Sequence, residues 1–115
     1  VLFVDDEEIV IDIMKDILPM LFKNSYYAKD GVEGIAQFKQ NKPDIIITDI
    51  SMPHLDGISM LKVIKELDKN VKIIFLSGHN EEDQIEACKD LDGEFIIKPI
   101  SSNILYQALG KVLSA

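Results

Sequence analysis

The sequence at residues 42–49 is KPDIIITD, and this stretch decides the fold. Three consecutive isoleucines, entered through Pro43, predict a strand over residues 44–48 that is buried on both faces, as strands in the middle of a parallel sheet are. Asp49 follows where the strand ends, and open α/β sheets bind their ligands at the carboxyl ends of the strands. An isolated acid at a strand end more commonly caps the next turn. A functional interpretation of Asp49 therefore needs other reactive side chains at the same edge.

Composition limits the class of protein. The 115 residues predict one domain, and a hydrophobic content of 47% is enough for a core. The net charge of −8, with lysine as the basic residue and no arginine, argues against direct contact with nucleic acid and suits a divalent cation.

The single cysteine, Cys88, excludes an intrachain disulfide and favours a reducing, cytoplasmic location. No apolar run reaches the ~20 residues of a membrane span, and no signal peptide is recognised. Because the chain begins inside an apolar run without an initiator methionine, we expect residues 1–115 to be a module of a longer protein.

Apolar runs and turn residues alternate along the chain. Strands are predicted at residues 1–4, 25–29, 44–48, 71–77 and 94–97. Helices are predicted after the acids at 5–8, over 32–38, 58–67 and 81–90, and from Ser101 or Ser102 onward to 113. The helix at 81–90 has few apolar residues, which predicts low local stability. Five strands alternating with five helices predict an α/β, doubly wound, five-stranded parallel sheet of flavodoxin-like order 2-1-3-4-5.

The first predicted helix carries two local signals. Ile9, Ile13, Ile17 and Leu21 recur every four residues, with Val10, Met14 and Leu18 beside them, which predicts an apolar stripe that packs against the sheet. Pro19 lacks an N–H to donate, and it predicts a kink or an end of the helix near residue 18.

The predicted topology brings reactive side chains to one edge of the sheet. The carboxyl ends of four strands present Asp5 and Asp6, then Asp49, Ser77 and Lys98. Three carboxylates and one ammonium leave two negative charges, which one divalent cation would neutralise. The ligands on offer are hard oxygens, so Mg²⁺ or Mn²⁺ is expected rather than Zn²⁺.

This set of side chains is suited to phosphoryl transfer. Asp49 could attack in line and form an acyl phosphate. The metal and Lys98 would stabilise charge on the transferring group, and Ser77 would donate a hydrogen bond to a phosphoryl oxygen.

From the first strand to the last helix, the chain resembles the response-regulator receiver domains of bacterial two-component signalling. The pieces that carry the resemblance are VDDE at 4–7, the strand that ends at Asp49, MP at 52–53 with DG at 56–57, LSG at 76–78 and IKP at 97–99. The resemblance implies that Asp49 is the phosphoacceptor and Asp6 a direct Mg²⁺ ligand. It also implies that Asp5 acts largely through bound water and that the backbone carbonyl of Ser51 completes the protein ligands.

The resemblance also implies a conformational switch. Ser77 would be the switch hydroxyl, and Lys98 would contact the phosphate, oriented by a cis bond to Pro99. Phe95 stands where many members have a switch tyrosine, and Gly78 where alanine is usual. The implied function is therefore that of a signalling domain rather than a turnover enzyme.

The resemblance implies partners as well. A histidine kinase or a histidine phosphotransfer protein would supply the phosphoryl group. The face formed by the fourth helix, the fifth strand and the fifth helix would contact an effector domain or a second copy of the chain, without direct contact with nucleic acid or membrane.

Two other classes remain open from the residues alone. An aspartate-nucleophile phosphatase would carry a second Asp at position 51, where this chain has Ser51. A binding module without phosphoryl chemistry could be a flavin domain or a receiver fold that has lost its reactivity. A flavin domain would carry a phosphate-binding loop after the first strand, where Asp5 and Asp6 would repel a phosphate. The presence of all five site residues argues against a receiver fold without reactivity.

Overall fold

The computed structural model describes residues 1–50, 55–78, 91, 93–98 and 100–113. Its strands form one parallel sheet in the order β2-β1-β3-β4-β5, which confirms the predicted topology. The strands are β1 (Leu2–Val4), β2 (Tyr26–Ala28), β3 (Ile45–Asp49), β4 (Lys72–Ser77) and β5 (Glu94–Ile97). Two strands lie on each side of β3, so the isoleucine run is at the centre of the sheet, as predicted. Every residue of the strand is buried.

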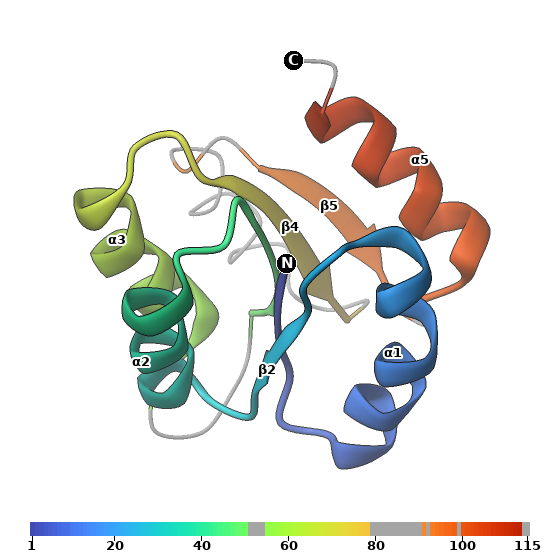
Figure 1. The fold of residues 1–115 in the computed structure, drawn as a ribbon, viewed down its shortest axis with the longest axis horizontal. Helices are drawn as coiled ribbons and strands as arrows, with labels where there is room; N and C mark the ends of the chain where they lie inside the picture. Colours follow the sequence, from blue (N-terminus) through green and yellow to red (C-terminus); the bar gives the residue numbers. More distant parts are fainter. Residues whose placement is uncertain (51–54, 79–90, 92, 99, 114–115) are drawn as a thin grey trace.

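Helices cover both faces of the sheet (Figure 1). They are α1 (Glu8–Leu21), α2 (Gly31–Asn41), α3 (Gly57–Leu67) and α5 (Ser102–Leu113). The α1 and α5 helices lie on one face, and α2 and α3 lie on the other. The doubly wound arrangement is therefore confirmed, while the helix predicted at 81–90 falls outside the described residues. Among the described helices, none is long and apolar enough to cross a lipid bilayer.

The core consists of two apolar clusters, one on each face of the sheet. Alternate residues of β3 enter the two clusters: Ile45 and Ile47 join α1 and α5, whereas Ile46 joins the α2 and α3 side. Every residue of β3 is buried. This double burial explains why the strand needs an uninterrupted apolar run instead of alternating polar positions.

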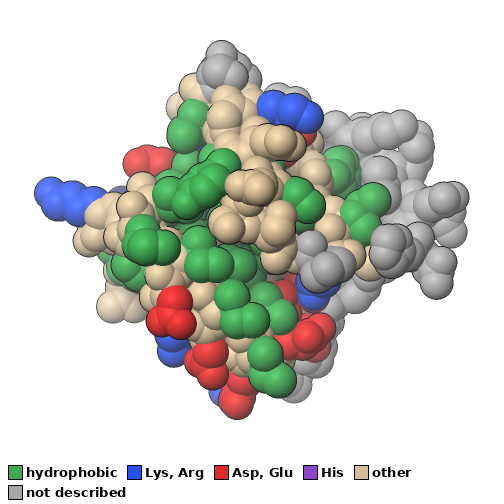
Figure 2. Space-filling view, turned by 90° about the vertical axis from the view of Figure 1, so that its right-hand side faces the viewer, with side chains coloured by type: hydrophobic (Ala, Val, Ile, Leu, Met, Phe, Trp, Pro, Cys, Tyr) green, Lys and Arg blue, Asp and Glu red, His purple; other side chains and the backbone are tan. Residues whose placement is uncertain are grey.

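The predicted apolar stripe of α1 is wrong at two of its seven positions, Ile9 and Ile13. Ile9 is 75% exposed and Ile13 is 50% exposed, whereas Ile17 and Leu21 pack against the core as expected. The fully covered positions are Ile11, Met14 and Leu18. The apolar arc of this helix is wider than the side that the sheet covers, so part of it faces outward. Figure 2 shows hydrophobic side chains gathered on this α1 and α5 side of the molecule.

Of the two outcomes predicted for Pro19, the end of α1 near residue 18 is wrong, and the kink stays a prediction. The helix includes Pro19 and continues to Leu21, after which the N–H of Phe22 donates to the Leu18 carbonyl at 2.9 Å. A proline this close to the end removes one hydrogen bond of the last turns, and the helix continues past it with Leu18 fully buried.

Gly110 offers a test of how helix propensity contributes to this fold. It lies within α5, its position is exposed, and an added Cβ would meet no atom within 4 Å. We expect Gly110→Ala to raise the free energy of unfolding by about 0.5–1 kcal/mol, because glycine loses more backbone entropy on folding. Urea unfolding measures this change. A decrease would show that the position has a packing role.

Candidate functional site

The carboxyl edge of the sheet collects the predicted reactive side chains. Asp5 follows β1, Asp49 ends β3, Ser77 ends β4 and Lys98 follows β5. Parallel register aligns these ends, and Lys98 remains in register because its N–H donates to the Ser77 carbonyl at 2.9 Å. One backbone rule, parallel pairing, therefore brings distant parts of the sequence into one site.

Three carboxylates form the acidic part of the site. One oxygen each from Asp5, Asp6 and Asp49 lies within 4.8 Å of the others. Asp5 is fully buried and Asp49 is 5% exposed, whereas Asp6 is exposed. Two of the three charges are thus shielded from water, which makes a compensating cation favourable.

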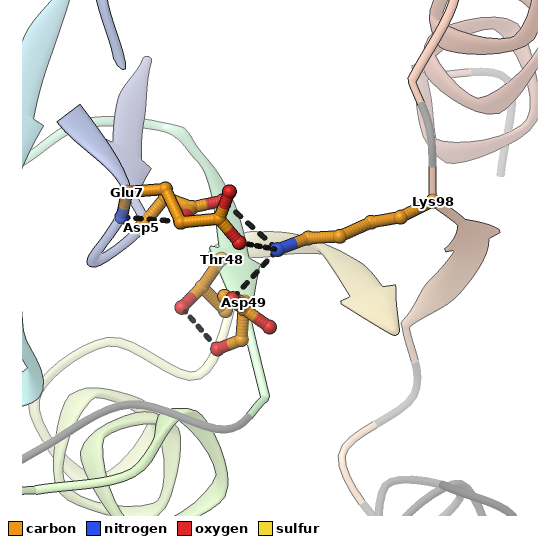
Figure 3. Close-up of polar contacts among 5 residues, drawn as sticks. All are labelled: Asp5, Glu7, Thr48, Asp49 and Lys98. Carbon is orange, nitrogen blue, oxygen red and sulfur yellow. Dashed lines mark hydrogen bonds and ion pairs between the residues drawn. The ribbon is translucent and has the colours of Figure 1, made fainter. Parts of the chain in front are cut away.

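Lys98 supplies the positive charge. Its Nζ donates to Asp49 Oδ2 at 2.8 Å and lies 3.3 Å from Asp5 Oδ2 (Figure 3). It also lies 3.7 Å from Glu7 Oε1. Glu7 was not predicted as a site residue, because an acid in this run is explained equally well by the start of α1. Its side chain is 61% exposed, so this ion pair is weak.

Two opposing effects set the pKa values of the buried acids: burial raises them, and the positive charge of Lys98 lowers them. Burial raises the pKa of Asp49 to about 6, and the hydrogen bond and charge of Lys98 lower it only partly. Burial likewise raises the pKa of Asp5, although the N–H of Glu7 and the Lys98 charge oppose the shift. Burial alone would lower the pKa of Lys98, but Asp49 and Asp5 raise it above its ordinary value. Lys98 is therefore charged at neutral pH, and one ammonium does not fully offset the buried acids.

The raised pKa of Asp49 predicts a pH dependence of stability. The folded state binds this proton more tightly than the unfolded chain, since the ordinary pKa is 3.8. The resulting stabilisation is present below about pH 4 and is lost as the pH rises through about 6. Each pKa unit corresponds to about 1.4 kcal/mol, so the loss reaches up to about 3 kcal/mol in metal-free protein at neutral pH.

Urea unfolding in EDTA, for wild type and Asp49→Asn across this range, measures the effect. The difference between the two free energies of unfolding should grow as the pH rises, and subtracting them removes the titration of other carboxylates. A difference that does not change with pH would contradict the assignment of the raised pKa to Asp49.

Among the described residues, four buried side-chain oxygens lack a hydrogen-bond partner, and two of them belong to this site. These two are Ser77 Oγ, in a fully buried residue, and Asp5 Oδ2, which has only the ion pair with Lys98. The other oxygen of Asp5 accepts the N–H of Glu7 at 2.9 Å. An unsatisfied hydroxyl at the end of β4 and an unsatisfied carboxylate oxygen after β1, at the same edge of the sheet, fit a site that is completed by a ligand and a cation. The hard oxygens of Asp5, Asp6 and Asp49 fit Mg²⁺.

The remaining predicted residues divide into two groups. Phe95 is half-buried on β5, with its ring stacked on Phe75 at a centroid distance of 5.1 Å. Its role as a switch residue stays a prediction. Ser51 and Pro99 lie outside the described residues, so the carbonyl ligand and the cis bond also stay predictions.

Comparisons with known proteins agree with this geometry. A family model described as "Response regulator receiver domain" matches residues 1–110. The chemotaxis protein CheY of Bacillus subtilis is 33% identical over 99% of this chain and 97% of its own. The transcriptional regulatory protein HptR of Staphylococcus aureus is 34% identical over 98% of this chain but only 46% of its own. A crystal structure of a CheX–CheY–BeF3–Mg complex from Borrelia burgdorferi matches with a TM-score of 0.87 and 32% identity, covering 97% of this chain and 87% of that chain.

Proposed function

This chain belongs to the response regulator receiver domain family of two-component phosphorelay signalling, and from that premise we propose that it is a Mg²⁺-dependent switch phosphorylated on Asp49. The observation that supports this most directly is the environment of Asp49. Its carboxylate is almost fully buried, is held by Lys98 at 2.8 Å and shares a metal-sized cluster with Asp5 and Asp6.

Asp49 is the nucleophile in this proposal. Lys98 engages Oδ2, which leaves Oδ1 as the oxygen that attacks phosphorus. A new O–P bond forms, and the bond from phosphorus to the donor breaks. With a phosphohistidine donor, the electron pair of the P–N bond leaves with the imidazole. The product is an acyl phosphate.

Asp5, Asp6 and Asp49 would hold the cation, together with the carbonyl of Ser51. Mg²⁺, or Mn²⁺ in its place, would neutralise the excess negative charge of the acids and of the incoming phosphoryl oxygens. Burial of Asp5 and Asp49 strengthens this attraction, because buried charges are screened less by water and salt.

Lys98 and Ser77 would respond to the new charge. A phosphoryl group carries about −1.5 to −2 charges near neutral pH. The Lys98 ammonium would transfer from the carboxylate to a phosphoryl oxygen, and the Ser77 hydroxyl, which has no partner among the described residues, would donate to another. These movements would bias the face formed by residues 81–90, β5 and α5, including Phe95, between two arrangements.

The family implies a histidine kinase as phosphoryl source, and a histidine phosphotransfer protein is an equivalent donor. Some relatives are transcriptional regulators in which the matching region is under half of the protein. We propose that the output of this chain passes to an effector domain or to a second copy, in the cytoplasm and without direct contact with DNA. In this proposal the chain does not turn over an external substrate.

Incubation with Mg²⁺ and acetyl phosphate, followed by intact mass spectrometry, tests the proposed function. We expect the mass of one phosphoryl group to be added and then removed by hydroxylamine, which cleaves acyl phosphates. EDTA should prevent the addition. Absence of an adduct, or steady release of phosphate from an external monoester, would contradict a phosphoacceptor switch.

A further inference from the structure

The peptide that follows the phosphoacceptor is held from two sides by residues outside the reactive set. The hydroxyl of Thr48 donates to the carbonyl oxygen of Asp49 at 2.9 Å (Figure 3). The first residue of α3, Gly57, lies so close to the same carbonyl that an added Cβ would collide with its oxygen. Resting on the proposed function, we propose that Thr48 and Gly57 are positioning residues that set where the Asp49 carboxylate points.

Thr48 is an unexpected residue in its strand. It follows three isoleucines, is fully buried, and pairs with Val4 and Phe75 on the neighbouring strands. A valine would have the same shape and would avoid the cost of burying a hydroxyl. The hydroxyl instead finds its acceptor on the adjacent residue, the phosphoacceptor itself. The hydroxyl therefore binds the backbone of the residue that carries the reactive carboxylate.

Gly57 is required for space and not for backbone conformation. No described glycine has a positive φ, so the left-handed region does not explain this glycine. Besides the carbonyl oxygen, an added Cβ would lie 3.2 Å from the carbonyl carbon of Asp49 and 3.2 Å from the Cα of Ile50. All three are backbone atoms, which cannot rotate out of the way as a side chain can. A larger residue at position 57 must therefore displace the backbone at the acceptor.

Two further hydrogen bonds limit how that backbone can move. The N–H of Ile50 donates to the Leu76 carbonyl at 3.2 Å, and the N–H of Gly57 donates to the Ile50 carbonyl at 2.9 Å. Ile50, the residue after the acceptor, is thus held by β4 through its N–H and by α3 through its carbonyl. Because it is constrained, a push from position 57 would tilt the Asp49 side chain away from Lys98 and from the acidic cluster. A misplacement of about 1 Å can cost roughly a hundredfold in rate.

A matched pair of glycine variants tests the inference. Gly57→Ala is compared with Gly110→Ala, where the same atom is added in open space. At saturating Mg²⁺ and equal acetyl phosphate, we expect Gly57→Ala to slow phosphorylation at least about tenfold and to weaken Mg²⁺ binding, while Gly110→Ala matches wild type. A purely structural role would alter the urea midpoint without changing these properties of the folded protein.

Thr48 variants decide the question even if Gly57→Ala does not fold. Thr48→Val removes only the hydroxyl, and Thr48→Ser retains it. We expect Thr48→Val to slow phosphorylation about three- to tenfold and Thr48→Ser to restore the rate to within about twofold of wild type. Valine at the wild-type rate, or serine no better than valine, would overturn the inference. If wild type takes up no phosphate, the proposed function fails, and Mg²⁺ affinity, which should fall in Thr48→Val and recover in Thr48→Ser, still tests the positioning role separately.

Discussion

Asp49→Asn is expected to abolish phosphoryl uptake while making the metal-free protein more stable at neutral pH. The amide cannot form the acyl phosphate, so the adduct disappears completely. The same substitution removes a buried charge whose pKa is raised to about 6, chiefly by burial. We expect the free energy of unfolding to rise by about 2–3 kcal/mol near pH 7.5 in EDTA. A substitution that abolishes function and raises stability indicates that the Asp49 charge serves the chemistry and not the stability of the fold.

Intact mass spectrometry and urea unfolding on the same samples measure the two effects. Asp12→Asn is the matched control, because Asp12 is exposed on α1 and an equivalent change there should leave both properties at wild-type values. A phosphoryl adduct on Asp49→Asn would show that another residue is the acceptor. A variant less stable than wild type would show that Lys98 stabilises the Asp49 charge more than burial destabilises it.

Lys98→Met is expected to have the opposite effect on stability. It leaves Asp5 and Asp49 close together without their ammonium, while methionine retains much of the apolar stem. Breaking a fully buried ion pair costs about 3–5 kcal/mol, and because the Lys98 side chain is 23% exposed we expect about 2–4 kcal/mol in metal-free protein near pH 8. Loss of a donor to the transferring group should also slow phosphorylation by about 10²–10³-fold.

Acidification and Mg²⁺ should each recover the stability of Lys98→Met. Lowering the pH to about 5 protonates the carboxylates that lost their partner, and Mg²⁺ replaces the missing positive charge. Mg²⁺ should therefore stabilise this variant more than it stabilises wild type. Lys62→Met, at an exposed position of α3, is the control. A loss of stability in Lys98→Met that neither acid nor Mg²⁺ reverses would indicate lost packing instead of uncompensated charge.

Much of the site could be predicted because the strands are parallel, so residues at their carboxyl ends lie at one edge of the sheet. Once the isoleucine run identifies β3 as a central strand, the carboxyl ends of its neighbours must lie at the same edge. Asp5, Asp49, Ser77 and Lys98 therefore come together without any knowledge of their side-chain contacts. The alternation of elements predicts a parallel sheet, and the order 2-1-3-4-5 is one of the few doubly wound orders compatible with it.

The features that sequence analysis missed depend on tertiary surroundings. Helical periodicity identifies the apolar arc of α1 but not which half the sheet covers, so Ile9 and Ile13 were assigned to the wrong side. Glu7 meets Lys98 only because the Lys98 side chain, which starts at the end of β5, reaches across the edge of the sheet to the acids that follow β1. The close approach of Gly57 to Asp49 likewise depends on how α3 enters after the strand. For each of these residues, the neighbouring sequence explains the residue type as well as the tertiary contact does.

The most direct test of this account is to locate the phosphoryl group chemically. Borohydride reduces an aspartyl phosphate to homoserine, so the Mg²⁺- and acetyl phosphate-treated protein should yield homoserine at position 49 when its peptides are sequenced by mass spectrometry. Homoserine should be absent when EDTA replaces Mg²⁺. Reduction at Asp5 or Asp6, or a phosphorylated protein that yields no homoserine, would contradict the assignment of Asp49 as the acceptor.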